Sequence, residues 1–154
     1  MKRTLSFLLL LATLACGGPQ MVATGGGQTG GPDARAALDG FLAGVRSQDL
    51  QVMSNYWGTA DGPARNRLDR AELEKRELTM ACYLAHDRAP RVIDDEPRAG
   101  NRRLFNVELT FGTTSRTTEI ITVRGPSERW YVENADIRLT QALCEAYRTR
   151  RTGG

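Results

Sequence analysis

Residues 104–111, LFNVELTF, decide the fold, because apolar and polar side chains alternate along them with a period of two. Phe105, Val107, Leu109 and Phe111 fall on one face of this stretch, and Asn106, Glu108 and Thr110 fall on the other. Such alternation is typical of a β-strand with one buried face and one solvated face. It therefore predicts an antiparallel sheet that is covered on one side only.

Three further strands are predicted around this segment. Residues 91–96 precede it, residues 117–123 follow it, and residues 129–137 come last. The turn-forming stretches PRAGN at 97–101 and GPS at 125–127 separate them. We therefore expect a meander of about four antiparallel strands.

The chain before residue 91 follows a helical period of about 3.6. Asp49 and Asp69 stand where helix N-caps belong, and Glu72 completes a capping-box pattern with Asp69. Gly58 can end the second helix. The expected helices run from Asp33 through Val45, from Asp49 through Trp57, from Arg70 to about His86, and, after the strands, from Thr140 to Tyr147.

The third of these helices carries two apolar stripes. One stripe contains Leu73, Met80, Ala81 and Leu84, and the other contains Leu78, Cys82 and Ala85. Two stripes predict that this helix is contacted on two sides.

Helices followed by antiparallel strands define an α+β fold, with the N-terminal helices packed on one sheet face. This order, together with FLAGVRSQDL at residues 41–50, resembles the NTF2-like (SnoaL-like, cystatin-like) superfamily. The resemblance covers residues 34–138 and implies a curved sheet that wraps a long helix into a cone. The short C-terminal helix lies outside that pattern. A different helix-on-sheet arrangement is the alternative.

The N-terminus has the features of an export signal. Lys2 and Arg3 form a basic start, residues 5–15 form the apolar run LSFLLLLATLA, and Cys16 follows. The run is shorter than the roughly 20 apolar residues of a membrane-spanning helix. We therefore predict that residues 1–15 are a signal peptide.

Residues 13–16, TLAC, resemble the lipobox of bacterial lipoproteins, whose cysteine thiol takes a diacylglyceryl group before cleavage. The resemblance implies lipidation at Cys16 and anchoring to the cell envelope, at the periplasmic face or the outer membrane. Several acyl chains would hold the protein on a membrane, at about 0.8 kcal/mol per buried methylene. Ordinary secretion, with cleavage after Ala15, is the alternative.

Residues 16–32 are expected to form a flexible tether. This stretch holds seven of the chain's 16 glycines and no charged side chain, so it cannot bury enough apolar surface to fold. Its root-mean-square reach is about 20–25 Å. The domain is then expected to occupy residues 33–149, with a disordered tail at 150–154.

Cys82 and Cys144 remain once Cys16 is assigned to lipid. An even pair of cysteines in an oxidising compartment predicts a disulfide. The bridge would stabilise the fold by about 4 kcal/mol for a loop of this length. Two buried free thiols are the alternative.

Charge does not point to nucleic acid as a partner. The formal net charge of +3 falls once Lys2 and Arg3 leave with the leader. Arginines cluster at 98–103 and at 148–151, where solubilising tips or contacts with anionic headgroups are expected. No base-stacking motif accompanies them.

We predict no catalytic, metal or cofactor site. His86 is the only histidine, and the neighbouring Asp87 would point about 100° away on a helix. Asp136 and Tyr83 are a second conceivable polar pair. One histidine and two paired cysteines cannot build a usual zinc site. The acidic run at 94–96 lacks the spacing of a calcium loop.

Two main functional hypotheses follow from this sequence. The first is a non-enzymatic envelope lipoprotein whose domain binds a partner protein or has a structural role. The second is a small-molecule binder or enzyme that uses a cavity in the cone. Self-association through the sheet face of Asn106, Glu108 and Thr110 is a third. The candidates for lining a cavity, with core packing as their alternative role, are Tyr56, Trp57, Tyr83, Phe105, Phe111 and Trp130.

Overall fold

The computed structural model describes residues 28–153. The predicted signal peptide, the lipidation residue Cys16 and the tether as far as residue 27 lie outside the described residues.

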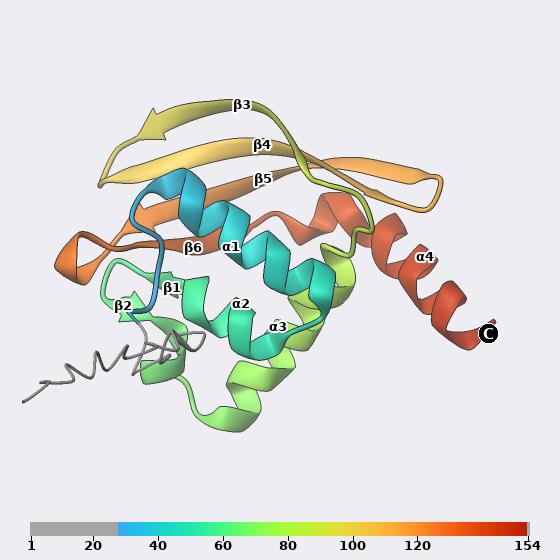
Figure 1. Cartoon of the computed structure of the whole chain (residues 1–154), viewed down its shortest axis with the longest axis horizontal. Coiled ribbons are helices and arrows are strands. Elements are labelled where there is room, and N and C mark those ends of the chain that lie inside the picture. Colours follow the sequence, from blue (N-terminus) through green and yellow to red (C-terminus); the bar gives the residue numbers. More distant parts are fainter. Residues whose placement is uncertain (1–27, 154) are drawn as a thin grey trace, which may run out of the picture.

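Four antiparallel strands form one sheet in their order along the chain, as Figure 1 shows. They are β3 (Arg91–Arg98), β4 (Arg102–Phe111), β5 (Thr114–Arg124) and β6 (Trp130–Ala135). The central pair β4–β5 runs in unbroken register from Arg102↔Val123 to Phe111↔Thr114. The predicted α+β class and the four-stranded antiparallel meander are therefore confirmed.

The main helices lie on one side of this sheet (Figure 1). They are α1 (Ala34–Ser47), α2 (Leu50–Tyr56), α3 (Arg70–Tyr83) and α4 (Gln141–Thr152). Asp33, Asp49 and Asp69 cap the first three through hydrogen bonds from backbone N–H groups to their carboxylates. The short pieces between them are β1 (Gly58–Thr59), β2 (Gly62–Pro63), and the 3-10 helices η1 (Ala64–Asn66), η2 (Pro126–Glu128) and η3 (Ile137–Thr140).

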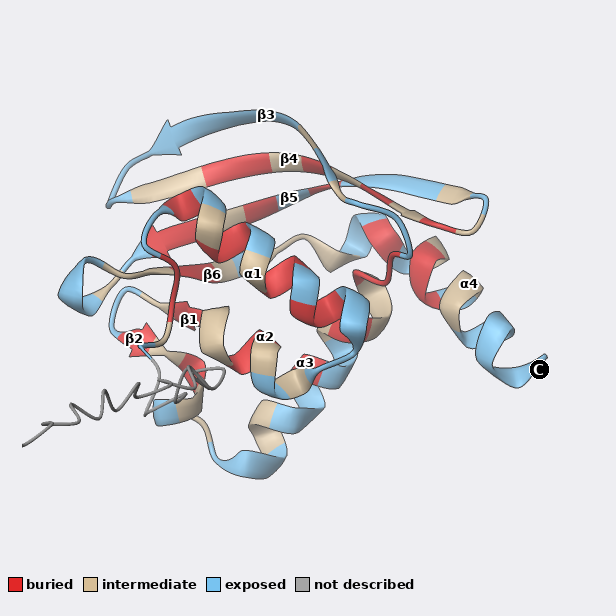
Figure 2. Cartoon of the chain, in the orientation of Figure 1, coloured by how far each residue is buried: buried red, intermediate tan, exposed pale blue. Residues whose placement is uncertain are grey.

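The core lies between α1 and the sheet, and Figure 2 shows the buried residues gathered there. Leu38, Phe41 and Val45 of α1 are fully buried. Phe105, Val107 and Leu109 of β4 are buried on the facing side, as their alternation predicts. α4 packs across the ends of β4 and β5 and against α3, so it closes the core at that end.

Helix α3 differs from its prediction in length and in its second stripe. It ends at Tyr83, because the chain then turns to the sheet, where the Asp87 N–H donates to the Thr110 carbonyl. Leu78 is 54 % exposed, so the predicted contact along the whole second stripe is wrong. Contact with α4 begins one turn later, at Cys82.

Both ends of the domain extend beyond their predicted limits. Gly31 exchanges two backbone hydrogen bonds with Trp130, so residues expected in the tether belong to the fold. A Cβ on Gly31 would lie 2.4 Å from the Ala37 nitrogen, which explains why glycine is needed there. The predicted disordered tail is helical through Thr152, because Arg150 packs 4.0 Å from the Phe111 ring centroid and bonds to Asp87.

Candidate binding groove

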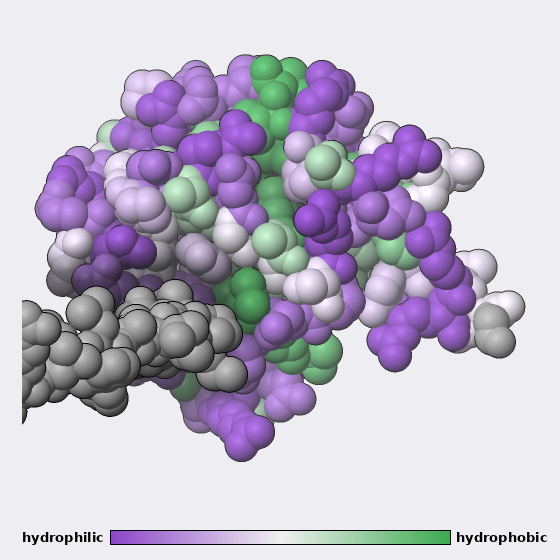
Figure 3. Space-filling model, viewed as in Figure 1, coloured by the Kyte–Doolittle hydropathy of each residue, from purple (hydrophilic) through white to green (hydrophobic). Residues whose placement is uncertain are grey.

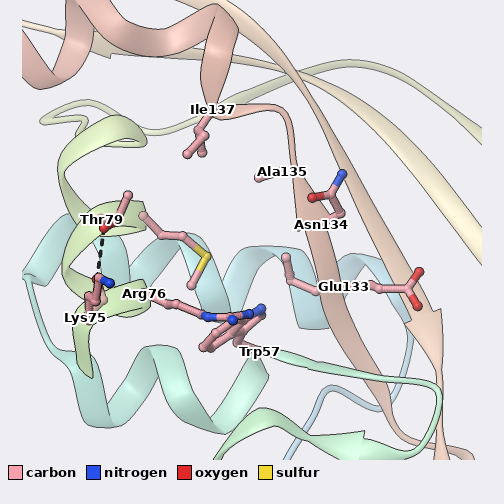
Figure 4. A pocket seen from close by; sticks show the side chains of 10 residues that line it. Trp57, Lys75, Arg76, Thr79, Glu133, Asn134, Ala135 and Ile137 are labelled. Atoms are coloured by element: carbon pink, nitrogen blue, oxygen red, sulfur yellow. Dashed lines mark hydrogen bonds between the residues drawn. The ribbon is translucent and has the colours of Figure 1, made fainter. Parts of the chain in front are cut away.

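A groove of about 390 Å³ lies between α3 and β6 (Figure 4). Its α3 side presents Lys75, Arg76, Thr79 and Met80, which recur at helical spacing and therefore share one face. Its other side is β6, one of the two outer strands of the sheet. We call this site the α3–β6 groove.

Five of the ten residues that line the α3–β6 groove are apolar. Trp57 stands at the C-cap of α2, where its N–H donates to Met53 and its carbonyl accepts from Ala64. These two bonds fix the backbone that carries the indole. The remaining apolar lining comes from Met80, Val132, Ala135 and Ile137. A lining that combines apolar side chains with polar groups is typical of a binding site.

The polar groups of the groove are mostly engaged already. Arg76 donates to Glu72 at 2.6 Å. The Glu133 carboxylate takes two hydrogen bonds from Arg102, at 2.5 and 2.7 Å, and Figure 4 shows it pointing away from α3. Within residues 28–153, neither the Lys75 ammonium nor the Asn134 side chain has a hydrogen-bond partner. These two groups are therefore available to a ligand.

Of the six aromatic residues predicted as cavity lining, only Trp57 lines this groove. Phe105 and Phe111 are buried in the core, and the Phe111 ring meets Tyr147 edge to face at 5.8 Å. Tyr56 packs across Gly40 of α1. Trp130 lines a separate hollow with Arg35, Asp95 and Arg103, and Tyr83 is partly buried outside both. Most of these aromatic residues therefore belong to the core or pack against it, which was the alternative to lining a cavity.

His86 and Asp87 do not form an acid–base pair. His86 is buried with Nδ1 2.9 Å from the Leu84 carbonyl, and Nε2 has no partner. Burial lowers the pKa of His86, so the ring is neutral near pH 7. Asp87 instead accepts from the Gly112 N–H and from Arg150, and the Gly112 bond is the largest cause of its lowered pKa.

Asp136 and Tyr83 are not paired either. The Asp136 carboxylate accepts two side-chain hydrogen bonds from Arg138, at 2.9 and 2.8 Å. These bonds lower the pKa of Asp136 and keep it ionised. Asp136 is therefore an ion-pair partner at the start of η3.

The Cys82–Cys144 disulfide is present, as predicted. It joins α3 to α4 with a Cα–Cα distance of 4.6 Å. Cys82 lies in the last turn of α3, just beyond the residues that line the groove, so the bridge fixes the C-terminal end of this helix.

Glu77 is a buried carboxylic acid that the sequence pattern did not reveal. Its side chain is 3 % exposed, and Oε1 has no hydrogen-bond partner. Burial raises the pKa of Glu77 to about 7, against the opposing effect of Arg65. The neighbouring residues Leu73, Glu74 and Leu78 did not indicate that Glu77 is buried, because charged residues predominate in this part of α3.

The sheet face proposed for self-association is occupied by contacts within the chain. Asn106 donates to Asp94 at 2.6 Å, Glu108 accepts from Arg91 at 2.9 Å, and Thr110 bonds to Ser115 at 2.7 Å. The surface in Figure 3 is largely hydrophilic, with apolar residues in narrow patches. The three large apolar residues that are most exposed among those described are Leu78, Ile93 and Leu139.

The described residues hold no cluster of three or more His, Cys, Asp or Glu side chains able to bind a metal ion. No helix in this part of the chain is long and apolar enough to cross a membrane. No protein-family model, curated protein or solved structure matches the chain. The geometry of the groove is therefore the basis for a functional conclusion.

Proposed function

We propose that the chain is a membrane-tethered, extracytoplasmic lipoprotein whose NTF2-like domain binds another envelope protein without catalysing a reaction. The α3–β6 groove carries this proposal, because its chemistry suits binding and lacks an acid–base pair. Its one carboxylate, Glu133, is neutralised by Arg102, and the only histidine lies elsewhere. An acid and a base positioned near each other are the usual requirement for proton-transfer catalysis.

Two further observations support the extracytoplasmic location and the fold class in this proposal. The Cys82–Cys144 bridge is the kind of bond that persists in oxidising compartments. The order of helices and then an antiparallel meander is compatible with the NTF2-like resemblance of the sequence, and it supports that part of the proposal. Lipid on Cys16 is the remaining element, and it rests on the TLAC motif.

The anchor is tested by the intact mass of protein extracted from its native membrane. We expect a mass for residues 16–154 plus acyl chains, rising by two hydrogens on reduction. An unlipidated chain that starts at Met1 or at Cys16 would contradict the anchoring.

The binding role is tested by photo-cross-linking in intact cells. A photoreactive phenylalanine analogue at position 79, inside the groove, is expected to give one defined cross-linked protein. The same analogue at position 117, on the exposed face of β5, is the matched control and should give none. His86→Ala is expected to leave the cross-link in place. Absence of any cross-link at position 79 would contradict a protein partner at this groove.

Binding of a small molecule is the second candidate, and the groove volume favours it. About 390 Å³ falls within the range of ligand pockets. Native mass spectrometry of the membrane-extracted protein distinguishes the two functions. A retained mass that disappears in a Met80→Arg variant would favour the small molecule over the protein partner.

A further inference from the structure

The two outer strands of the sheet differ in how they are protected. β3 is the outer strand on one side, and seven of its eight residues are exposed. Each outer strand has one register shift, between Val92 and Asp94 in β3 and at Glu133 in β6, but only β3 contains a proline, Pro97. Proline has no backbone N–H to donate, so it blocks the addition of another strand along β3. β3 is therefore closed to edge pairing.

The first half of β6 is covered by this chain itself. The Trp130 N–H donates to the Gly31 carbonyl at 2.9 Å, and the Gly31 N–H donates back at 2.8 Å. Two residues later, Trp57 forms a parallel bridge with Val132. No further strand pairs with the outer side of β6 within residues 28–153.

The second half of β6 presents backbone groups at an open edge. The Asp136 N–H donates to the Glu119 carbonyl at 2.9 Å, and Asn134 is paired with Ile121. Bonding direction alternates along an antiparallel strand, so Asn134 faces β5 and the Ala135 N–H and carbonyl face outward. The Ala135 side chain meanwhile lines the groove. The open edge and the α3–β6 groove are therefore one continuous surface.

The first described residues of the chain, 28–31, run away from this surface. Gly30 has φ +77°, which turns the chain where it would otherwise continue along β6. Gln28 lies with Asp61 and Pro126, beside the opposite end of β6 from Ala135. Within residues 28–153, no segment of the chain occupies the open edge.

We propose that the edge at Glu133–Ala135 takes an extended segment of a partner protein, which adds to the sheet as a fifth strand. This inference rests on the proposed function and specifies the partner's chemistry. Main-chain hydrogen bonds to Ala135 hold the segment, and alternate side chains enter the groove. Apolar side chains contact Trp57, Met80 and Ile137, and a carboxylate reaches the free Lys75 ammonium.

The test uses defined peptides and the full chain in detergent micelles. The probe is a fluorescent seven-residue peptide. Its first, third, fifth and seventh residues are threonine, and its second, fourth and sixth residues are isoleucine, isoleucine and glutamate. The reversed order covers the opposite strand direction. Binding is measured by fluorescence anisotropy, and N-methylation of either alternate set of peptide residues tests the backbone bonds.

Strand addition predicts an asymmetric result. Methylating the residues that face Ala135 should weaken binding by about tenfold or more, since their donors are lost, and methylating the other set should leave it unchanged. Equal affinity of both methylated peptides would overturn strand addition and leave the groove as a binding site. Failure of every peptide to bind would overturn the inference, while the cross-link at position 79 decides the proposed function separately.

Two variants locate the peptide on this surface. Lys75→Glu should weaken the glutamate peptide about two- to fivefold, the range for an exposed ion pair, and a lysine peptide should recover the loss. Arg148→Glu on α4 makes the same charge change and should have no effect. Ala135→Pro removes the outward donor and should abolish binding, with circular dichroism confirming the fold. If Lys75→Glu and Arg148→Glu behave alike, the peptide is not at the groove.

A second copy of this chain is the competing occupant of the edge. Light scattering of the full chain at the assay concentration distinguishes it. A dimer that the peptide dissociates would overturn the partner segment and place a second β6 at the edge. A monomer supports the partner segment.

Discussion

Helix α3 has one flank tied to the rest of the domain and one flank that stands apart from β6. On the tied flank, Glu77, Ala81 and Leu84 are buried, and the Cys82–Cys144 bridge fixes the C-terminal turn of the helix. On the open flank, Lys75 and Thr79 are exposed and Met80 is only partly buried. The same helix therefore serves both as a core element and as one wall of the groove.

This difference indicates that one flank of α3 contributes to stability and the other flank is available for binding. The disulfide and the buried contacts hold α3 without help from β6, so the groove needs no contact across it. Residues on the open flank can then be selected for a ligand with little cost to the fold. Changes on the tied flank should reduce the free energy of unfolding, and changes on the open flank should reduce binding.

The largest effect on stability is expected from removing the Cys82–Cys144 disulfide. The double variant Cys82→Ser/Cys144→Ser should lose about 4 kcal/mol in the free energy of unfolding. The two cysteines are 62 residues apart in the sequence, and without the bridge the unfolded chain is no longer constrained to a closed loop, so its entropy rises. Chemical denaturation of the full chain measures the loss. Cys16→Ser is the control, and it should leave the unfolding midpoint unchanged. Equal stability of the double variant would mean that packing alone holds α4 on α3.

Paired truncations on α3 compare the two flanks directly. Leu84 is fully buried at the C-cap, so Leu84→Ala should cost about 2–5 kcal/mol through the cavity that it leaves. Met80 faces the groove, where solvent or a ligand can fill the space, and Met80→Ala should cost about 1 kcal/mol. Denaturant midpoints of both variants measure the difference. Similar losses would show that the open flank is part of the core.

Much of the fold was predictable from local patterns. The alternation at 104–111 placed Phe105 and Leu109 in the core, and the caps Asp49 and Asp69 marked where helices begin. These signals are local, so a single sequence carries them. The disulfide was also predictable, because only two cysteines remain after Cys16.

The groove was not predictable, since it depends on how distant elements meet. Trp57, Met80 and Asn134 come from α2, α3 and β6, and no local pattern links them. Gly31 illustrates the same limit at the N-terminus. The glycine-rich composition of residues 16–32 favoured a flexible tether, yet Gly31 in this stretch pairs with Trp130, about a hundred residues later.

Glu77 gives the tied flank a dependence on pH. Its pKa is raised from 4.5 to about 7, so the folded protein binds a proton more tightly than the unfolded chain does. Stability is then fully present below pH 4.5 and falls as the pH rises through 7, by about 3 kcal/mol, since each pKa unit is about 1.4 kcal/mol. This part of the pH dependence should vanish in Glu77→Gln, as followed by urea unfolding between pH 5 and 8.

Glu74→Gln is the matched control for this titration. Glu74 is exposed, and its charge is the smallest of the three causes that set the pKa of Glu77, so its replacement should keep most of the decline with pH. A Glu77→Gln variant that still loses stability between pH 5 and 8 would assign the effect to another group.

The smallest effect on stability is expected at Lys75. Its ammonium has no partner among residues 28–153, and its side chain is exposed, so Lys75→Glu should change the free energy of unfolding by no more than about 0.5 kcal/mol. A denaturation curve of the variant, set beside wild type, checks this. A loss above 1 kcal/mol would mean that Lys75 supports the helix, and its effect on peptide binding would then be indirect. An unchanged midpoint together with weakened binding separates the roles of the two flanks in one variant.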